Sequence, residues 1–285
     1  MKKSILFLIP LFPVFVICQT GNKKAEIVHV FPSDTIPMQY SPGYPNFNMP
    51  ILDGIVNDSL HLKVFFDTGT SGNRFFISDS LKNLFVRDSA CVQIGKFKKR
   101  MGIKYLGSSQ GSLIDLFGKN TILVGWKFFE NKIIEFNFKN QHIFVYEELP
   151  DVTEYSKTKI TLHHPQNTPL LIPVQVVLQG KTIEDTVIID TGHNGYIDFN
   201  IKQVEKQGID KIDAFYGKST VSGGSLPGFS IPADTIKIGT LYVANQNIRI
   251  SFSNHPGLLG TKTMENFSVI LDLINFDLYL KKIDN

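Results

Sequence analysis

The stretch Val64-Phe65-Phe66-Asp67-Thr68-Gly69-Thr70-Ser71-Gly72 decides the fold, because the chain repeats its pattern in its second half. The second copy is Val187-Ile188-Ile189-Asp190-Thr191-Gly192-His193-Asn194-Gly195. Each copy has an apolar run typical of a buried strand, then Asp-Thr-Gly, then a further Gly at the same spacing. An internal repeat of this kind predicts a chain built from two related halves.

The repeat continues downstream of both motifs. Leu123-Val124-Gly125 corresponds to Leu258-Leu259-Gly260, and Phe136-Asn137-Phe138 corresponds to Leu271-Asp272-Leu273. The offset between copies grows from 123 residues at the Asp (190 − 67) to 135 at the Gly (260 − 125), so the second copy is longer. We place the extra residues in the Gly-rich stretch 222–225 or in the strands after it.

Composition favours an all-β or mainly β protein with a few short helices. Of the 285 residues, 42% are apolar, and the chain contains 23 Phe in short runs separated by Gly, Asn, Asp and Ser. The formal charge is only +3, and the one basic cluster is Lys96-Phe97-Lys98-Lys99-Arg100. Such a cluster is typical of a solvated hairpin tip, so we expect no nucleic-acid partner.

The N-terminus has the pattern of an export signal. Lys2 and Lys3 precede an apolar run from Ile5 to Cys18, which is too short to span a bilayer comfortably. We therefore expect residues 1–18 to be a signal peptide, with no stable membrane span and a periplasmic or secreted mature chain. A lipid anchor on Cys18 is the alternative. Without Cys18 only Cys91 remains, so no internal disulfide is expected.

The two Asp-Thr-Gly motifs suit a two-carboxylate site. Two carboxylates that face each other cannot both ionise easily, so one keeps a proton while the other accepts one from a water molecule. Gly69 and Gly192 would let the two turns approach without a clash. The hydroxyls of Thr68 and Thr191 could bond across to the other half's backbone and lock the turns together.

These residues resemble the pepsin/retropepsin-like aspartic peptidases, in particular their bacterial two-lobed relatives. The resemblance covers roughly residues 45 to 283 and rests on the two Asp-Thr-Gly turns and their two downstream Gly segments. It implies a bilobal pepsin-like fold of two pseudo-symmetric β-barrel lobes, with Asp67 and Asp190 catalytic in the cleft between them. It also implies polypeptide substrates bound in extended form under a hairpin flap, with no cofactor and no metal.

The corresponding domain boundaries follow the repeat. Residues 19–44 are expected to form an N-terminal strand or arm, 45–150 the N-terminal lobe and 151–285 the C-terminal lobe. Because one chain supplies both carboxylates, catalysis needs no second subunit, and we expect a monomer.

Two features depart from the family pattern. Tyr105 and Gly107 resemble a flap tip, but the same residues suit any β-hairpin turn. Thr70 suits the hydroxyl partner of the first carboxylate, whereas the second copy has His193 in its place. A protonated His193 would add positive charge beside the pair; the alternative, which we favour, is that it points into solvent.

The sequence thus predicts an aspartic endopeptidase. The alternative is a catalytically weak or inactive peptide-binding module that keeps the cleft and takes a peptide as an added strand. A purely structural envelope protein is the third possibility. The presence of both Asp67 and Asp190 favours the peptidase, because neither alternative needs two facing carboxylates.

Overall fold

The computed structural model describes residues 30–40, 49–76, 89–102, 104–105, 121–162, 169–206, 215–221, 224–252 and 256–283. In these ranges the chain is mainly β-strand, as predicted. The helical elements described are the 3-10 helix η1 (Trp126–Phe129) and the short α-helices α3 (Ile201–Lys206) and α4 (Thr261–Met264). No helix in these ranges is long and apolar enough to cross a membrane.

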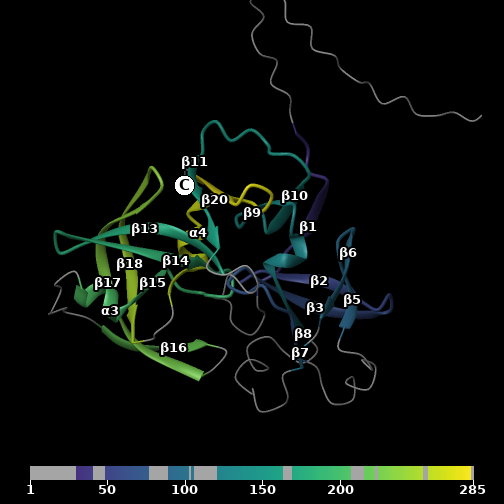
Figure 1. Ribbon diagram of the computed structural model, residues 1–285, viewed down its shortest axis with the longest axis horizontal. Helices are drawn as coiled ribbons and strands as arrows, with labels where there is room; N and C mark the ends of the chain where they lie inside the picture. The colour runs from purple at the N-terminus through teal and green to yellow at the C-terminus, as the bar shows by residue number, and fades with distance from the viewer. Residues whose placement is uncertain are drawn as a thin grey trace, which may run out of the picture.

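The first half of the chain forms a sheet that we call the first-half sheet (Figure 1). Its central hairpin buries alternate apolar side chains on one face, as expected for paired strands with period two. Its seven described strands are, in spatial order, β6 (Phe97–Gly102), β5 (Ser89–Ile94), β2 (Ile51–Val56), β3 (Leu60–Asp67), β8 (Thr121–Gly125), β4 (Arg74–Phe76) and β7 (Lys104–Tyr105).

The second half forms a sheet that closes on itself, the second-half barrel. Closure comes from β17, which pairs with β13 as well as with β16 and β18. The strands in spatial order are β12 (Thr161–Leu162), β13 (Leu170–Leu178), β14 (Lys181–Ile189), β19 (Gly257–Leu259), β15 (Ile197–Asn200), β18 (Leu241–Ser251), β17 (Gly224–Ile238) and β16 (Phe215–Val221).

The prediction of two β-barrels therefore holds for the second half only. In the described part of the first half the sheet is a half-barrel, because no pairing joins its edge strands β6 and β7. Strand length explains the difference. β17 has 15 residues and reaches three partners, whereas β5 and β6 have six residues each. The long strands β17 and β18 follow the Gly-rich stretch where the sequence placed the extra residues.

Both halves contribute to a third, six-stranded sheet, which we call the shared sheet. Its order is β1 (Asp34–Pro37), β10 (His142–Tyr146), β9 (Ile133–Asn137), β20 (Phe267–Asp272), β21 (Asp277–Lys282) and β11 (Ser156–Lys159). At its centre Ile134 pairs with Leu271 and Phe136 pairs with Val269. Val269 lies 135 positions after Ile134, and Leu271 lies 135 positions after Phe136, so each pair joins one residue to the equivalent of the other. A local two-fold axis therefore passes between β9 and β20.

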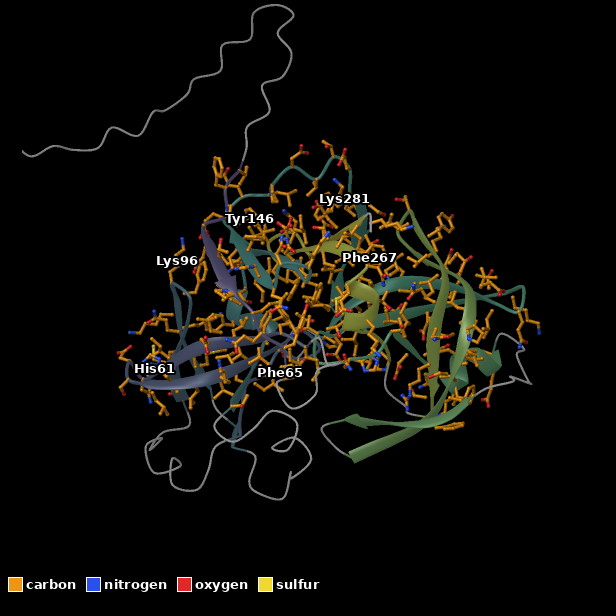
Figure 2. All side chains as sticks on the ribbon, turned by 180° about the vertical axis from the view of Figure 1, so that it is seen from behind. His61, Phe65, Lys96, Tyr146, Phe267 and Lys281 are labelled. Carbon is orange, nitrogen blue, oxygen red and sulfur yellow. The ribbon has the colours of Figure 1, made fainter. Side chains whose placement is uncertain are left out.

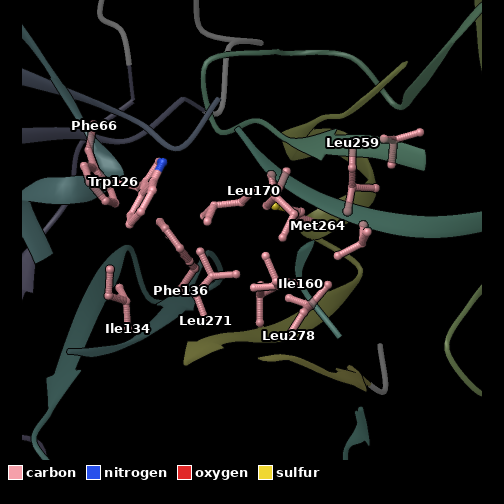
Figure 3. Packing of buried hydrophobic residues seen from close by; sticks show 14 of the residues in the cluster. Phe66, Trp126, Ile134, Phe136, Ile160, Leu170, Leu259, Met264, Leu271 and Leu278 are labelled. Carbon is pink, nitrogen blue, oxygen red and sulfur yellow. The ribbon is translucent and has the colours of Figure 1, made fainter. Parts of the chain in front are cut away.

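A continuous core joins the three sheets. Phe66, Phe129 and Phe136 are fully buried and stack or meet edge to face, with ring centroids 5.3 and 6.0 Å apart in the two pairs that Phe66 forms. Trp126 is buried and meets Phe276 edge to face, with ring centroids 6.1 Å apart. Figure 3 shows this cluster running from Phe66 and Trp126 to residues of the second half. The core therefore fixes the ends of β3 and β14 relative to each other.

Candidate active site

Asp67 and Asp190 end the two strands that the repeat predicts to be equivalent. Asp67 is the last residue of β3 and lies in register with Gly125 on the parallel strand β8. Asp190 directly follows β14, and its N–H donates to the carbonyl of Leu259 on the parallel strand β19 at 3.0 Å. In each half, therefore, the apolar-apolar-Gly segment runs beside the strand that carries the Asp.

Each carboxylate is held by its own turn. The N–H of Gly69 donates to Oδ1 of Asp67 at 2.8 Å, and the N–H of Gly192 donates to Oδ1 of Asp190 at 2.7 Å. A backbone N–H two residues downstream is a strong donor to a carboxylate. Both side chains are thus oriented by the same local geometry.

The two threonines of the motifs bond across from one half to the other. The hydroxyl of Thr68 accepts from the N–H of Thr191 at 3.0 Å and donates to the carbonyl of Ile189 at 2.8 Å. The hydroxyl of Thr191 does the same in reverse, accepting from the N–H of Thr68 at 3.0 Å and donating to the carbonyl of Phe66 at 2.7 Å. Both threonines are fully buried, so these four bonds lock the turns in a water-free environment.

The glycines of the motifs are required by the closeness of the two turns. A Cβ atom on Gly69 would lie 2.5 Å from Cγ of Asp190, and a Cβ on Gly192 would lie 2.8 Å from Cγ of Asp67. Each carboxylate therefore sits against the Gly of the other half's turn. No larger residue fits at either position without moving a carboxylate.

This closeness changes the electrostatics of Asp190. Burial raises the pKa of Asp190 well above its usual value, and the neighbouring Asp67 carboxylate raises it further through its charge and a hydrogen bond. The N–H of Gly192 acts in the opposite direction and is outweighed. Asp190 therefore keeps its proton to a higher pH than an ordinary aspartate, as one member of a tightly coupled acid pair does.

The downstream glycines pack beneath the turns, as the repeat predicts. A Cβ on Gly125 would lie 2.4 Å from the carbonyl oxygen of Thr70, and a Cβ on Gly260 would lie 2.3 Å from that of Gly195. The next residue bonds to each turn: Trp126 N–H donates to Thr70 at 3.0 Å, and the equivalent N–H of Thr261 donates to His193 at 2.9 Å.

The prediction that His193 points into solvent is wrong. Its side chain is only 11% exposed, and its Nε2 lies 3.3 Å from Oδ1 of Asp198 on β15. Gly195 and Gly260 enclose the ring, since a Cβ on either would lie within 2.6 Å of a ring atom. The absence of side chains at these two glycines leaves space for the ring beneath the turn, where it lies beside the Asp198 carboxylate instead of in solvent.

Asp198 in turn binds Arg249, and neither residue was identified from the sequence. Oδ2 of Asp198 accepts from Nη1 of Arg249 at 2.7 Å, across the parallel pair β15–β18. Burial alone would raise the pKa of Asp198, but His193 and Arg249 outweigh it and leave this pKa below the usual range. The sequence signal for this group of residues was His193, which follows the second motif where the first copy has Thr70.

The remaining predicted site residues are placed as follows. The Thr70 hydroxyl accepts from the N–H of Gly72 at 3.2 Å, which shapes the loop after the first motif. Tyr105 ends the two-residue strand β7 at the edge of the first-half sheet. Gly107 lies outside the described residues, and with it the predicted flap tip.

The basic cluster has acidic and carbonyl partners close by. Lys98 lies 2.5 Å from Asp58 and Lys99 lies 3.5 Å from Glu130. Lys96 donates to the carbonyl of Ser33 and sits at the outer end of the β5–β6 hairpin (Figure 2). Much of the cluster's charge is thus matched locally, which leaves little excess to attract a polyanion.

The arrangement can hold and move protons between two carboxylates and a small molecule set between them. In the described ranges no group of three or more His, Cys, Asp or Glu side chains is placed to hold a metal ion. Compared with known proteins, the chain matches no family model and no curated protein.

Proposed function

We propose that this chain is an aspartic endopeptidase of the bilobal pepsin-like type. The observation that carries the proposal is the reciprocal bonding of Thr68 and Thr191, which sets Asp67 and Asp190 against each other's turns. A structural or simple binding protein gains nothing from two partly buried carboxylates that repel each other. A hydrolase gains a rigidly aimed acid and base.

In the proposed reaction a water molecule between the carboxylates attacks the carbonyl carbon of the scissile peptide. One carboxylate accepts a proton from that water, while the protonated partner donates a proton to the carbonyl oxygen, giving a neutral tetrahedral diol. Collapse of the diol breaks the C–N bond as the nitrogen takes the proton from Asp67 and one diol hydroxyl gives its proton to Asp190, which yields a carboxylic acid and an amine and restores the starting pair. Because its pKa is raised, we assign the resting proton to Asp190 and the accepting role to Asp67.

The proposed substrate is a polypeptide in extended conformation, and the proposed compartment is the periplasm or the exterior. A strand-like substrate suits a site framed by sheets, since its main chain can add hydrogen bonds at a sheet edge. The chemistry requires no cofactor. One chain supplies both carboxylates, so the proposed active form is a monomer.

The test is cleavage of a diverse peptide mixture by the chain from Gln19 onward, followed by mass spectrometry from acidic to neutral pH. Asp67→Asn removes the proposed base, and Asp53→Asn is the matched control on β2, an exposed residue paired with Lys63 at 2.6 Å. We expect cleavage by wild type and control and none by Asp67→Asn. An inhibitor that mimics the tetrahedral diol should block the same cleavages.

Two outcomes would overturn the proposal. Undiminished cleavage by Asp67→Asn would show that the products come from another site or a contaminant. A folded wild-type chain that binds peptides but cleaves none at any pH would instead identify a peptide-binding module.

A further inference from the structure

Three ionisable side chains from three different segments meet beneath the second Asp-Thr-Gly turn. His193 follows the turn, Asp198 lies on β15 and Arg249 lies on β18. Asp198 bridges the other two: one oxygen lies 3.3 Å from the imidazole and the other accepts from the guanidinium at 2.7 Å. Their side chains are 11%, 6% and 13% exposed. We call these residues the buried triad.

The buried triad is attached directly to the carboxylate-bearing turn. The N–H of His193 donates to the carbonyl of Asp190 at 3.2 Å, and its own carbonyl accepts from the N–H of Thr261 at 2.9 Å. The Thr261 hydroxyl donates to the same carbonyl at 3.2 Å. The backbone of His193 is therefore part of the turn that holds Asp190, and its side chain extends from that turn to Asp198.

Among the described residues of the first half, no equivalent cluster of ionisable side chains is found. The position equivalent to His193 is Thr70, whose hydroxyl makes a local bond to Gly72 at 3.2 Å. The position equivalent to Asp198, eight residues after the Asp, is the apolar Phe75. Burying three ionisable groups costs free energy that an apolar side chain would not, so their presence on one side only calls for a role on that side.

We propose that His193, Asp198 and Arg249 are positioning residues that hold the second Asp-Thr-Gly turn and set the net charge beside Asp190. The proposal rests on the proposed function for its catalytic consequence, but the electrostatic effect itself does not require cleavage. The triad has a net charge of one positive unit when its imidazole is protonated and no net charge when its imidazole is neutral.

The charge of the triad reaches the carboxylate pair. Asp198 contributes to the raised pKa of Asp190, behind burial and Asp67. Among the described residues, the charged groups on elements packed around this turn include Asp67 from β3 and Lys262 from α4, and the backbone N–H of Lys262 donates to the carbonyl of Gly195 at 3.1 Å. Helix α3, which packs against β14, β15 and β18, adds Lys202, Glu205 and Lys206. β19 carries no charged residue. Variants of the triad leave Asp67 and Lys262 unchanged, so their effects report the triad alone.

The experiment follows the protonation of Asp190 by NMR, in protein carrying ¹³C at the aspartate carboxyl carbons. The signal is assigned by its loss in Asp190→Asn. Three variants are titrated beside wild type: His193→Gln, Asp198→Asn and the double variant. His61→Gln is the matched control, an exposed histidine on β3 next to the turn of the β2–β3 hairpin (Figure 2).

The expected shifts have opposite signs. His193→Gln removes a positive charge, so the midpoint for Asp190 rises by about half to one pH unit. Asp198→Asn removes a negative charge and lowers the midpoint by a similar amount, while the double variant, with the wild-type net charge, returns close to wild type. His61→Gln leaves the midpoint unchanged. In peptide cleavage, His193→Gln lowers kcat about tenfold with KM unchanged, as expected for a misplaced acid.

A purely structural role predicts a different pattern. It would lower the thermal unfolding temperature of all three variants without shifts of opposite sign, and that result would overturn the proposal. Should Asp198→Asn not fold, an unchanged or lowered midpoint in His193→Gln is sufficient to reject it. If wild type cleaves no peptide, the proposed function fails, yet the titration still decides whether the triad sets the charge at Asp190.

Discussion

Replacing Asp190 by Asn should separate stability from activity. The amide oxygen can still accept from the N–H of Gly192, which holds the carboxylate at 2.7 Å in wild type. The amide nitrogen can donate toward Asp67, whose carboxyl carbon lies 2.8 Å from the Cβ position of Gly192. The turn therefore keeps its bonds, while the repulsion between two carboxylates disappears.

The size of the effect follows from the raised pKa of Asp190. An aspartate whose pKa is higher in the folded than in the unfolded chain destabilises the fold above that pKa, by about 1.4 kcal/mol for each pH unit of difference. We therefore expect Asp190→Asn to raise the free energy of unfolding at pH 7. The gain should shrink as pH falls through the folded pKa and vanish near the unfolded value, about 3.9.

Cleavage should respond in the opposite direction. An amide cannot deliver the proton that the carbonyl oxygen needs, so kcat should fall by a factor of about 1000 or more. The assay pairs urea unfolding at pH 7 and pH 4 with peptide hydrolysis for wild type and variant. A variant that is less stable than wild type at pH 7 would refute the argument, because it would mean that the second carboxylate is held without cost.

Three further changes test the rest of the site. Thr191→Val removes the hydroxyl that accepts from the N–H of Thr68 and donates to the carbonyl of Phe66. The free energy of unfolding in urea should therefore fall by roughly 2–4 kcal/mol, whereas Thr191→Ser, which keeps the hydroxyl, should lower it far less. Gly69→Ala should abolish peptide cleavage because its Cβ would strike the Asp190 carboxylate, while Gly72→Ala, whose nearest contact would be 3.8 Å, should keep activity. Wild-type stability should rise from pH 7 to about pH 4, as Asp190 gains its proton, and fall below it as Asp198, with its lowered pKa, loses its charge; a monotonic fall from pH 7 would contradict this.

The symmetric part of the molecule could be predicted because symmetry leaves a local record in the sequence. Asp-Thr-Gly followed by a further Gly specifies a sharp turn, and Gly125 and Gly260 mark the strands that run beneath it. Matching positions in the two copies then face each other in space. In the shared sheet, the pairs Ile134–Leu271 and Phe136–Val269 are related to each other by the same two-fold repeat.

What departs from symmetry could not be predicted from one sequence. Closure of the second-half barrel depends on where β17 bends to meet β13, and no residue pattern within either strand records that contact. The partnership of Asp198 with Arg249 joins residues 51 positions apart, through a strand register that only the folded sheet defines. His193 was noticed as an exception, but its orientation depends on both of these partners.

The asymmetry matters because two identical turns would leave the pair with no preference for where the proton resides. Burial, Asp67 and Asp198 all raise the pKa of Asp190. Of these three causes, Asp198 is the one without an acidic equivalent in the other half, where Phe75 takes its position. Asp198 is paired with His193 and Arg249, and we propose that these groups, where the first half has Thr70 and Phe75, bias the position of the proton. A duplicated fold thus supplies the geometry of the pair, and three unduplicated side chains supply the difference between its members.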